Sequence, residues 1–99
     1  MRSQKTNLPM LPTFQCGFCN YTWREHYGLK NLSRHARGEY VRNLQRDLVV
    51  AGYPTKIDGY FGASTQSALI VFQFDHGLQE NGIADLRTKE ILITYCTCL

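Results

Sequence analysis

The stretch DGYFGASTQSALIVFQ, residues 58–73, decides the fold of this chain. It joins a glycine-bearing turn to the start of an amphipathic helix. A weaker copy of the same unit, NGIADLRTKEIL, follows at residues 81–92. The copies align at Asp58 and Asn81, Gly59 and Gly82, Tyr60 and Ile83, Thr65 and Thr88, and Leu69 and Leu92. Repetition of one turn-and-helix unit predicts a small helical repeat domain.

Each copy predicts one helix. The first begins at Gly62 or Ser64 and ends near His76, and the second, Leu86–Thr94, has Asp85 as its N-cap. The side chains expected to face the core are Thr65, Ala68, Leu69 and Phe72 in the first helix, and Ile91 and Leu92 in the second.

Residues 39–51 form the clearest helix outside the repeat. Apolar residues recur there at helical spacing and predict a buried face made of Val41, Leu44, Leu48 and Val49. The residues expected on the opposite side are Arg42, Asn43, Arg46 and Asp47. Gly52 can take the left-handed conformation that ends a helix. A short helix is also predicted within residues 23–35, with Leu29 and Leu32 on one face.

The predicted fold class is therefore all-α, a small three-helix bundle with an N-terminal extension that bears aromatic residues and cysteines. We divide the chain into a flexible arm (1–13), an extension packed on the main domain (14–38), the three-helix domain (39–95) and a cysteine-bearing tail (96–99). An apolar fraction of 43% with 19% charged residues is typical of a soluble globular domain. No apolar run approaches the roughly 18 residues of a membrane span, and the basic N-terminus lacks the apolar core of a signal peptide.

Charge is distributed unevenly along the chain. Residues 1–38 carry six Lys or Arg and one Glu, a net charge of +5, whereas residues 39–99 carry five against seven, a net charge of −2. A basic segment can attract nucleic acid or an anionic polymer such as a bacterial envelope. For so small a charge we favour a merely solvated surface.

The order and spacing of residues 40–92 resemble those of the bacterial and phage peptidoglycan-binding domain. The residues that carry this resemblance are Leu44-Gln45, Leu48, Gly52-Tyr53, Ile57 to Gly62, Thr65, Ala68, Phe72-Gln73, Gly77-Leu78, Asn81 to Ile83 and Thr88 to Leu92. The chain departs from the family's pattern at Asn81, where aspartate is commoner, and at Ala84-Asp85, which replaces a glycine-bearing link. The resemblance implies a three-helix module that binds the cell wall.

Candidate peptidoglycan-binding residues cluster around the first turn: Asp58, Gly59, Tyr60, Phe61, Thr65, Gln66 and Gln73. Sugar faces pack on apolar rings, and acetamido and carboxylate groups accept hydrogen bonds from amides and polar side chains. Glycines shape turns and apolar stripes form cores, so we assign Gly59 and Phe61 mainly to the fold. Tyr60, Thr65, Gln66 and Gln73 are the stronger ligand candidates.

Four cysteines form two close pairs, Cys16 with Cys19 and Cys96 with Cys98. Disulfides between the pairs would suit an oxidising envelope, four thiolates would suit a structural zinc ion, and reduced thiols are the third alternative. A zinc site using His26 or His35 with Cys16 and Cys19 would be a broken finger motif, because Leu32 stands in the place of a ligand. Solvent-exposed histidines are the simpler interpretation. No cofactor is expected, with structural zinc as the alternative.

The sequence and the resemblance together predict a non-catalytic, cell-wall-anchoring protein, phage-borne and either virion-associated or lysis-related. Residues 1–38 hold Glu25 as their only carboxylate, too few groups for an acid–base pair. A wall hydrolase with chemistry in the N-terminal third and a zinc-finger-like nucleic-acid binder are the alternatives. The expected partners are bacterial peptidoglycan and other phage or lysis proteins, without a membrane span and with nucleic acid disfavoured. The expected location is the bacterial cell wall, the periplasm or a virion.

Overall fold

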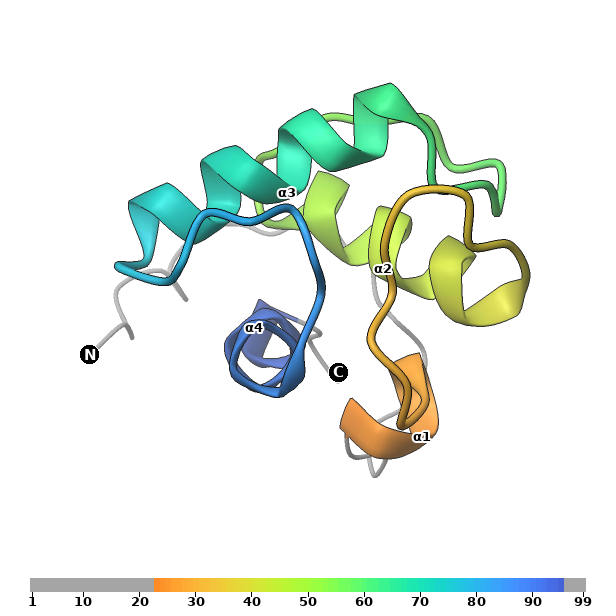
Figure 1. Cartoon of the computed structure of the whole chain (residues 1–99), viewed down its shortest axis with the longest axis horizontal. Coiled ribbons are helices and arrows are strands. Elements are labelled where there is room, and N and C mark those ends of the chain that lie inside the picture. The colour runs from red at the N-terminus through yellow and green to blue at the C-terminus, as the bar shows by residue number, and fades with distance from the viewer. Residues whose placement is uncertain (1–22, 96–99) are drawn as a thin grey trace.

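The computed structural model describes residues 23–95, which form an all-α fold around one core. Four α-helices and one 3-10 helix follow in order within that range: α1 (Trp23–Tyr27), α2 (Glu39–Val50), α3 (Ala63–Asp75), α4 (Leu86–Leu92) and η3 (Ile93–Tyr95). Figure 1 shows α3 lying across α2, with α4 and α1 on the other side of the molecule from α3. The predicted fold class is confirmed, with α1 as a short additional helix.

The apolar faces of the helices meet in a single cluster. Its members include most of the apolar stripe residues predicted from helical spacing, and the cluster comprises Tyr27, Leu32, Val41, Leu44, Leu48, Phe61, Ala68, Leu69, Phe72, Ala84 and Leu92. Val49 was also expected on the buried face of α2, but it is only partly buried and lies outside this cluster. Burial of these side chains is the main favourable term in folding, worth about 1.5–3 kcal/mol for each large one. Ile91 is only half-buried, because it lies at the edge of this cluster.

The side of α2 that was expected to face solvent is partly buried, so that expectation was wrong for two residues. Asn43 and Asp47 are buried, because α1 packs against α2 on that side. The Asp47 carboxylate accepts hydrogen bonds from Tyr27 Oη at 2.5 Å and from His26 Nε2 at 2.9 Å. His26 is therefore a core residue rather than the exposed histidine predicted. Burial, followed by the charge and hydrogen bond of Asp47, raises the pKa of Tyr27 well above its ordinary value.

Residues 28–38 form an extended strap instead of the helix predicted up to His35. Gly28 has a φ of +84°, which ends α1 at Tyr27. A side chain at this glycine would also clash with Tyr40, because an added Cβ would lie 2.6 Å from a carbon of the Tyr40 ring. The strap leaves α1 and runs past both turns of the repeat before it enters α2 (Figure 1). It therefore connects the two copies of the repeated unit.

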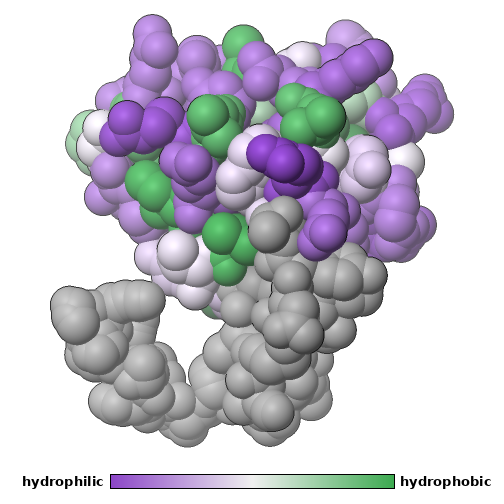
Figure 2. Space-filling view, turned by 90° about the horizontal axis from the view of Figure 1, so that it is seen from below, coloured by the Kyte–Doolittle hydropathy of each residue, from purple (hydrophilic) through white to green (hydrophobic). Residues whose placement is uncertain are grey.

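On one face of the molecule, exposed apolar side chains are separated from one another. Figure 2, seen from below relative to Figure 1, shows hydrophobic residues as separate patches between hydrophilic ones. No helix within residues 23–95 is long and apolar enough to cross a membrane.

Candidate functional site

The first turn of the repeat is organised by the buried side chain of Gln45. Its Oε1 accepts hydrogen bonds from the backbone N–H groups of Asp58 at 3.0 Å and Gly59 at 2.8 Å. Its Nε2 donates to Tyr60 O at 2.8 Å, Thr65 Oγ1 at 2.9 Å and Asp58 Oδ1 at 3.1 Å. One carboxamide thus binds both backbone and side-chain groups of the turn, and it pairs the buried N–H group of Gly59.

Gln73 makes four of the five corresponding contacts at the second turn. Its Oε1 accepts from Gly82 N at 2.9 Å, and its Nε2 donates to Ile83 O at 2.9 Å, Thr88 Oγ1 at 3.1 Å and Asn81 Oδ1 at 3.2 Å. Every partner is the aligned counterpart of a Gln45 partner. The internal repeat found in the sequence is therefore also a repeat of one hydrogen-bond arrangement.

The strap holds both turns in place through backbone pairing. Leu32 exchanges two hydrogen bonds with Ala84, at 2.8 and 3.3 Å, directly after the second turn. Phe61 N donates to Ala36 O at 2.9 Å, and His35 N donates to Phe61 O at 2.9 Å. Phe61 and Ala84 are aligned positions of the repeat, so the strap pairs with the same point of each copy.

Tyr60 is the aromatic residue that the first turn leaves at the surface. Its hydroxyl lies 3.0 Å from His35 Nδ1, and the Arg37 guanidinium sits over its ring, 4.8 Å from the centroid. The ring rests against Gly62, where an added Cβ would lie 3.1 Å from a ring carbon. Next to it, Arg34 Nη1 donates to Gln66 Oε1 at 3.2 Å. An aromatic face edged by cationic and amide groups is suited to a sugar that carries polar substituents.

His35 has an unusual backbone conformation at this position. Its φ is +78°, the only positive φ of a residue other than glycine among residues 23–95. Such a conformation costs about 1 kcal/mol or more for a side-chain-bearing residue, and such strain is often found at binding sites. The hydrogen bond of its backbone to Phe61 maintains it and directs the imidazole at the Tyr60 hydroxyl.

The corresponding place beside the second turn is covered. Lys89 aligns with Gln66, but its ammonium group is buried and donates to Gly28 O at 2.8 Å and Lys30 O at 2.6 Å. The same group lies 5.6 Å from the centroid of the Trp23 ring. Burial lowers the pKa of this amine, and the charge of Asp85 partly opposes the shift. The strap and α1 thus occupy at the second turn the space that remains open at the first.

The carboxylate of Asp58 takes part in the turn while remaining exposed. The hydrogen bond from Tyr60 N, 3.0 Å long, is the largest cause of its lowered pKa. The Gln45 amide adds to this effect, and the charge of Lys56 makes a smaller contribution. Asp58 is therefore an anion held at the base of an otherwise basic surface.

The structure separates the candidates predicted from sequence into two groups. Phe61, Thr65, Gln73 and Gly59 are buried in the turns and core, whereas Asp58, Tyr60 and Gln66 reach the surface together. Sequence reasoning did not select Gln45, which appeared there only as a family match, or Arg34 and Arg37. His35 was considered as a zinc ligand or as a solvent-exposed histidine, and it is exposed. The basic residues of the strap could have suggested a binding surface, but nothing in the sequence of the strap shows that it pairs with Phe61.

The cysteine predictions lie outside the described residues, since Cys16, Cys19, Cys96 and Cys98 all fall in residues 1–22 or 96–99. Within residues 23–95, no group of three or more His, Cys, Asp or Glu side chains is placed to hold a metal ion.

The family model described as "Putative peptidoglycan binding domain" matches residues 37–92, more than half of the chain. Over 70 residues the chain is 40% identical to the spore cortex-lytic enzyme of Bacillus cereus, a match covering 70% of this chain and 27% of that protein. Over 69 residues it is 44% identical to the zinc D-Ala-D-Ala carboxypeptidase of Streptomyces albus G, covering 65% and 24% respectively. The chain spans about a quarter of the length of these curated relatives.

Solved structures share the same architecture. The SleB N-terminal domain superposes with a TM-score of 0.68 at 38% identity, covering 72% of this chain and 99% of that one. A peptidoglycan-binding protein from Clostridioides difficile gives a TM-score of 0.63 at 33% identity, covering 65% and 40%. The Burkholderia AP3 phage endolysin gives 0.62 at 41% identity, covering 64% and 24%.

Proposed function

The chain belongs to the peptidoglycan-binding domain family, and we propose that it binds peptidoglycan without cleaving it, through the face around Tyr60. The matched region is the binding module of the family, and the relatives named as enzymes are about four times as long as the part they share with this chain. Wall attachment is therefore the role that residues 23–95 are best suited to perform.

One observation carries this proposal. Tyr60 stands on a turn fixed by Gln45, with His35 on its hydroxyl and Arg37 over its ring. A ring held in this way loses little conformational freedom on binding, which favours affinity. Asp58 and Gln66 lie beside it as further polar contacts, while Gly59, Phe61, Thr65 and Gln73 maintain the turns that present it.

We extend the proposal to a lysis-related or virion-associated protein that acts at the bacterial cell wall. The likeness to the Burkholderia AP3 phage endolysin and to spore cortex-lytic enzymes supports a role beside wall-degrading activity. Other phage or lysis proteins are the partners that such a role would require.

Co-sedimentation with insoluble, purified peptidoglycan tests the binding. We expect wild-type protein to sediment with the wall, and Tyr60→Ala to bind roughly tenfold more weakly because it loses the aromatic face. Phe74→Ala is the matched control, since Phe74 is a 65% exposed aromatic near the C-terminal end of α3, away from the first turn. Circular dichroism of each variant confirms folding.

A turbidity assay on the same suspension tests the absence of cleavage. Binding without clearing agrees with the proposal. Clearing by the isolated chain, or equal binding by wild type and Tyr60→Ala, would contradict it.

A further inference from the structure

The positive charge of the described chain is concentrated in the strap. Residues 28–38 hold Lys30, Arg34 and Arg37 and no acidic residue, whereas residues 39–95 carry five Lys or Arg against seven Asp or Glu. The bundle itself is therefore mildly acidic. Because the strap pairs with the first turn, two of its three cations are brought to Tyr60 and Gln66.

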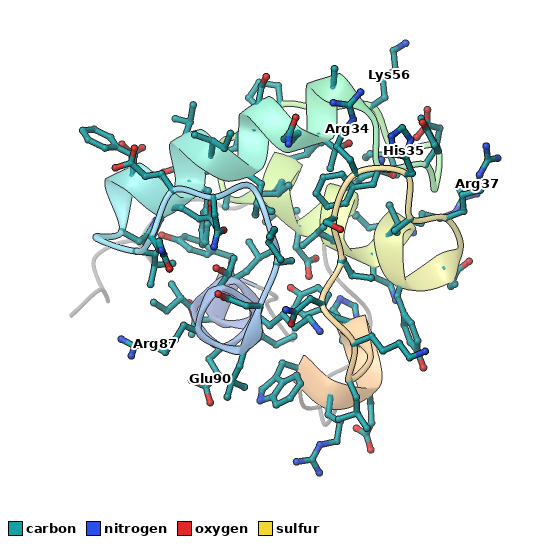
Figure 3. All side chains as sticks on the ribbon, in the orientation of Figure 1. Arg34, His35, Arg37, Lys56, Arg87 and Glu90 are labelled. Atoms are coloured by element: carbon teal, nitrogen blue, oxygen red, sulfur yellow. The ribbon has the colours of Figure 1, made fainter. Side chains whose placement is uncertain are left out.

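Three cationic side chains and His35 share one end of the molecule. Figure 3 shows Arg34, His35, Arg37 and Lys56 there, while Arg87 and Glu90 lie at the opposite side. Arg34, His35, Arg37 and Lys56 are all exposed. Arg34 and Arg37 are anchored by a hydrogen bond to Gln66 and by the Tyr60 ring, so their guanidinium groups are positioned rather than free to spread into solvent.

Nearby acids do not neutralise this group. Asp58 is the one carboxylate of the turn, and one of its oxygens is engaged by Tyr60 N and Gln45 Nε2. Glu39 faces Arg42 instead, at 3.8 Å. Counting Arg34, Arg37 and Lys56 against Asp58 leaves 3 − 1 = +2 around the turn.

The second turn has no such character. Asn81 and Ile83 replace Asp58 and Tyr60, and the Lys89 ammonium donates hydrogen bonds to two backbone carbonyls. Its other neighbours include Glu80 and Asp85. The cation aligned with Gln66 is thus turned inward at the second turn, whereas Arg34 and Arg37 are exposed at the first turn beside Gln66 and Tyr60.

We propose that Arg34 and Arg37 bind a free carboxylate of the peptidoglycan stem peptide, so that the module prefers walls whose stem peptides are not amidated. This inference rests on the proposed function and names the chemical feature recognised at the same site. Guanidinium groups match carboxylates in shape and charge. The cations are gathered at one turn beside an aromatic ring and an amide, which fits a carboxylate close to a sugar and peptide bonds. A phosphodiester polymer would be better matched by a longer line of cations.

Three preparations of one wall test the proposal with wild-type protein: untreated wall, wall whose carboxyl groups have been converted to amides with a carbodiimide and ammonium, and wall stripped of phosphodiester-linked polymers with hydrofluoric acid. We expect amidation to weaken binding about tenfold, the effect of losing a charge-assisted pair, and stripping to leave it unchanged. The difference should shrink as salt is added.

Variants connect the effect to the residues. Arg34→Gln with Arg37→Gln should lose about the same tenfold on untreated wall and should no longer distinguish it from amidated wall. Arg87→Gln removes one exposed positive charge on the other side of the molecule and should bind as wild type does.

Each outcome bears on the inference. Equal binding of untreated and amidated wall would overturn it and leave the proposed function standing. Loss of binding after stripping would assign the site to a phosphodiester polymer and also overturn it. Failure to bind untreated wall would overturn both the inference and the proposed function.

Discussion

Replacing Gln45 by glutamate tests whether one carboxamide determines the geometry of the first turn. Glutamate has nearly the same shape, and it keeps an oxygen that can accept from the N–H groups of Asp58 and Gly59. It loses the three hydrogen bonds that Nε2 donates within the turn. In their place a carboxylate oxygen would face the carbonyl of Tyr60 and the carboxylate of Asp58.

The expected loss in the free energy of unfolding follows from these contacts. Tyr60 O keeps its hydrogen bond from Gly62 N, so each lost Nε2 bond costs about 0.5–1.5 kcal/mol. A buried charge beside a like charge costs about 3–5 kcal/mol unless it is neutralised. Because the two costs overlap, we expect the free energy of unfolding to fall by about 3–5 kcal/mol at pH 7. A domain of this size has a total of about 5–15 kcal/mol, so the variant should be close to the limit of folding.

The loss should depend on pH in a defined direction. Burial and the neighbouring carboxylate raise the pKa of the new side chain in the folded state above its unfolded value of about 4.3. The folded state therefore binds more protons than the unfolded state near neutral pH. Stability is then fully present below about pH 4.3 and is lost as the pH rises through the folded pKa.

Urea unfolding followed by far-UV circular dichroism at pH 7 and pH 4 measures the effect. With a urea dependence of about 1.5 kcal/mol per molar, the midpoint should move down by about 2–3 M at pH 7 and by less at pH 4. Gln66→Glu is the control, since Gln66 is half-buried beside Arg34 and an acid there should change stability by less than about 1 kcal/mol. Equal midpoints for wild type and Gln45→Glu at pH 7 would refute the reasoning.

Three further variants probe other contacts. Gly28→Ala should lower the free energy of unfolding by about 1–3 kcal/mol in thermal unfolding, because the residue has a φ of +84° and its Cβ would meet the Tyr40 ring; an unchanged melting temperature would contradict this. Asp58→Asn should fold as wild type at pH 7, since Asn81 makes the same turn contacts. The wild type should lose stability as the pH falls through the lowered pKa of Asp58, and the variant should lack that loss; identical acid unfolding curves would refute the assignment. Burial and a hydrogen bond to Asp75 raise the pKa of Tyr53 from 10.0 to about 12, so the wild type should lose stability as the pH rises from 10 to 12. Tyr53→Phe lacks this ionisable group, and its free energy of unfolding should change less over the same pH range. An equally steep decline in the variant would contradict the assignment.

The amino-acid sequence by itself determined the helices and the repeat. Helical spacing of apolar residues located α2 and α3 and identified their buried stripes, because a helix must place residues three and four apart on one face. The match of Asp58-Gly59 with Asn81-Gly82 identified the two equivalent turns. These features are local, and local chemistry specifies them.

The tertiary structure alone decided how the strap is used. Residues 28–38 have no helical or strand period that would reveal their partners, and they pair with Phe61 and Ala84, far away in the chain. The same long-range packing buries His26 and Asp47 against each other, although histidine and aspartate are residue types usually found at the surface. Polar residues of this kind are buried only when a distant partner compensates them, and sequence spacing does not record that partner.

The candidate site depends both on local sequence and on tertiary packing. Sequence pointed to Tyr60 and Gln66 through the family's turn, whereas Arg34, His35 and Arg37 join them only because the strap pairs with that turn. The repeat alone would offer two equivalent sites. Folding makes them different, since the Lys89 ammonium donates hydrogen bonds to strap carbonyls at the second turn and the first turn remains open to solvent.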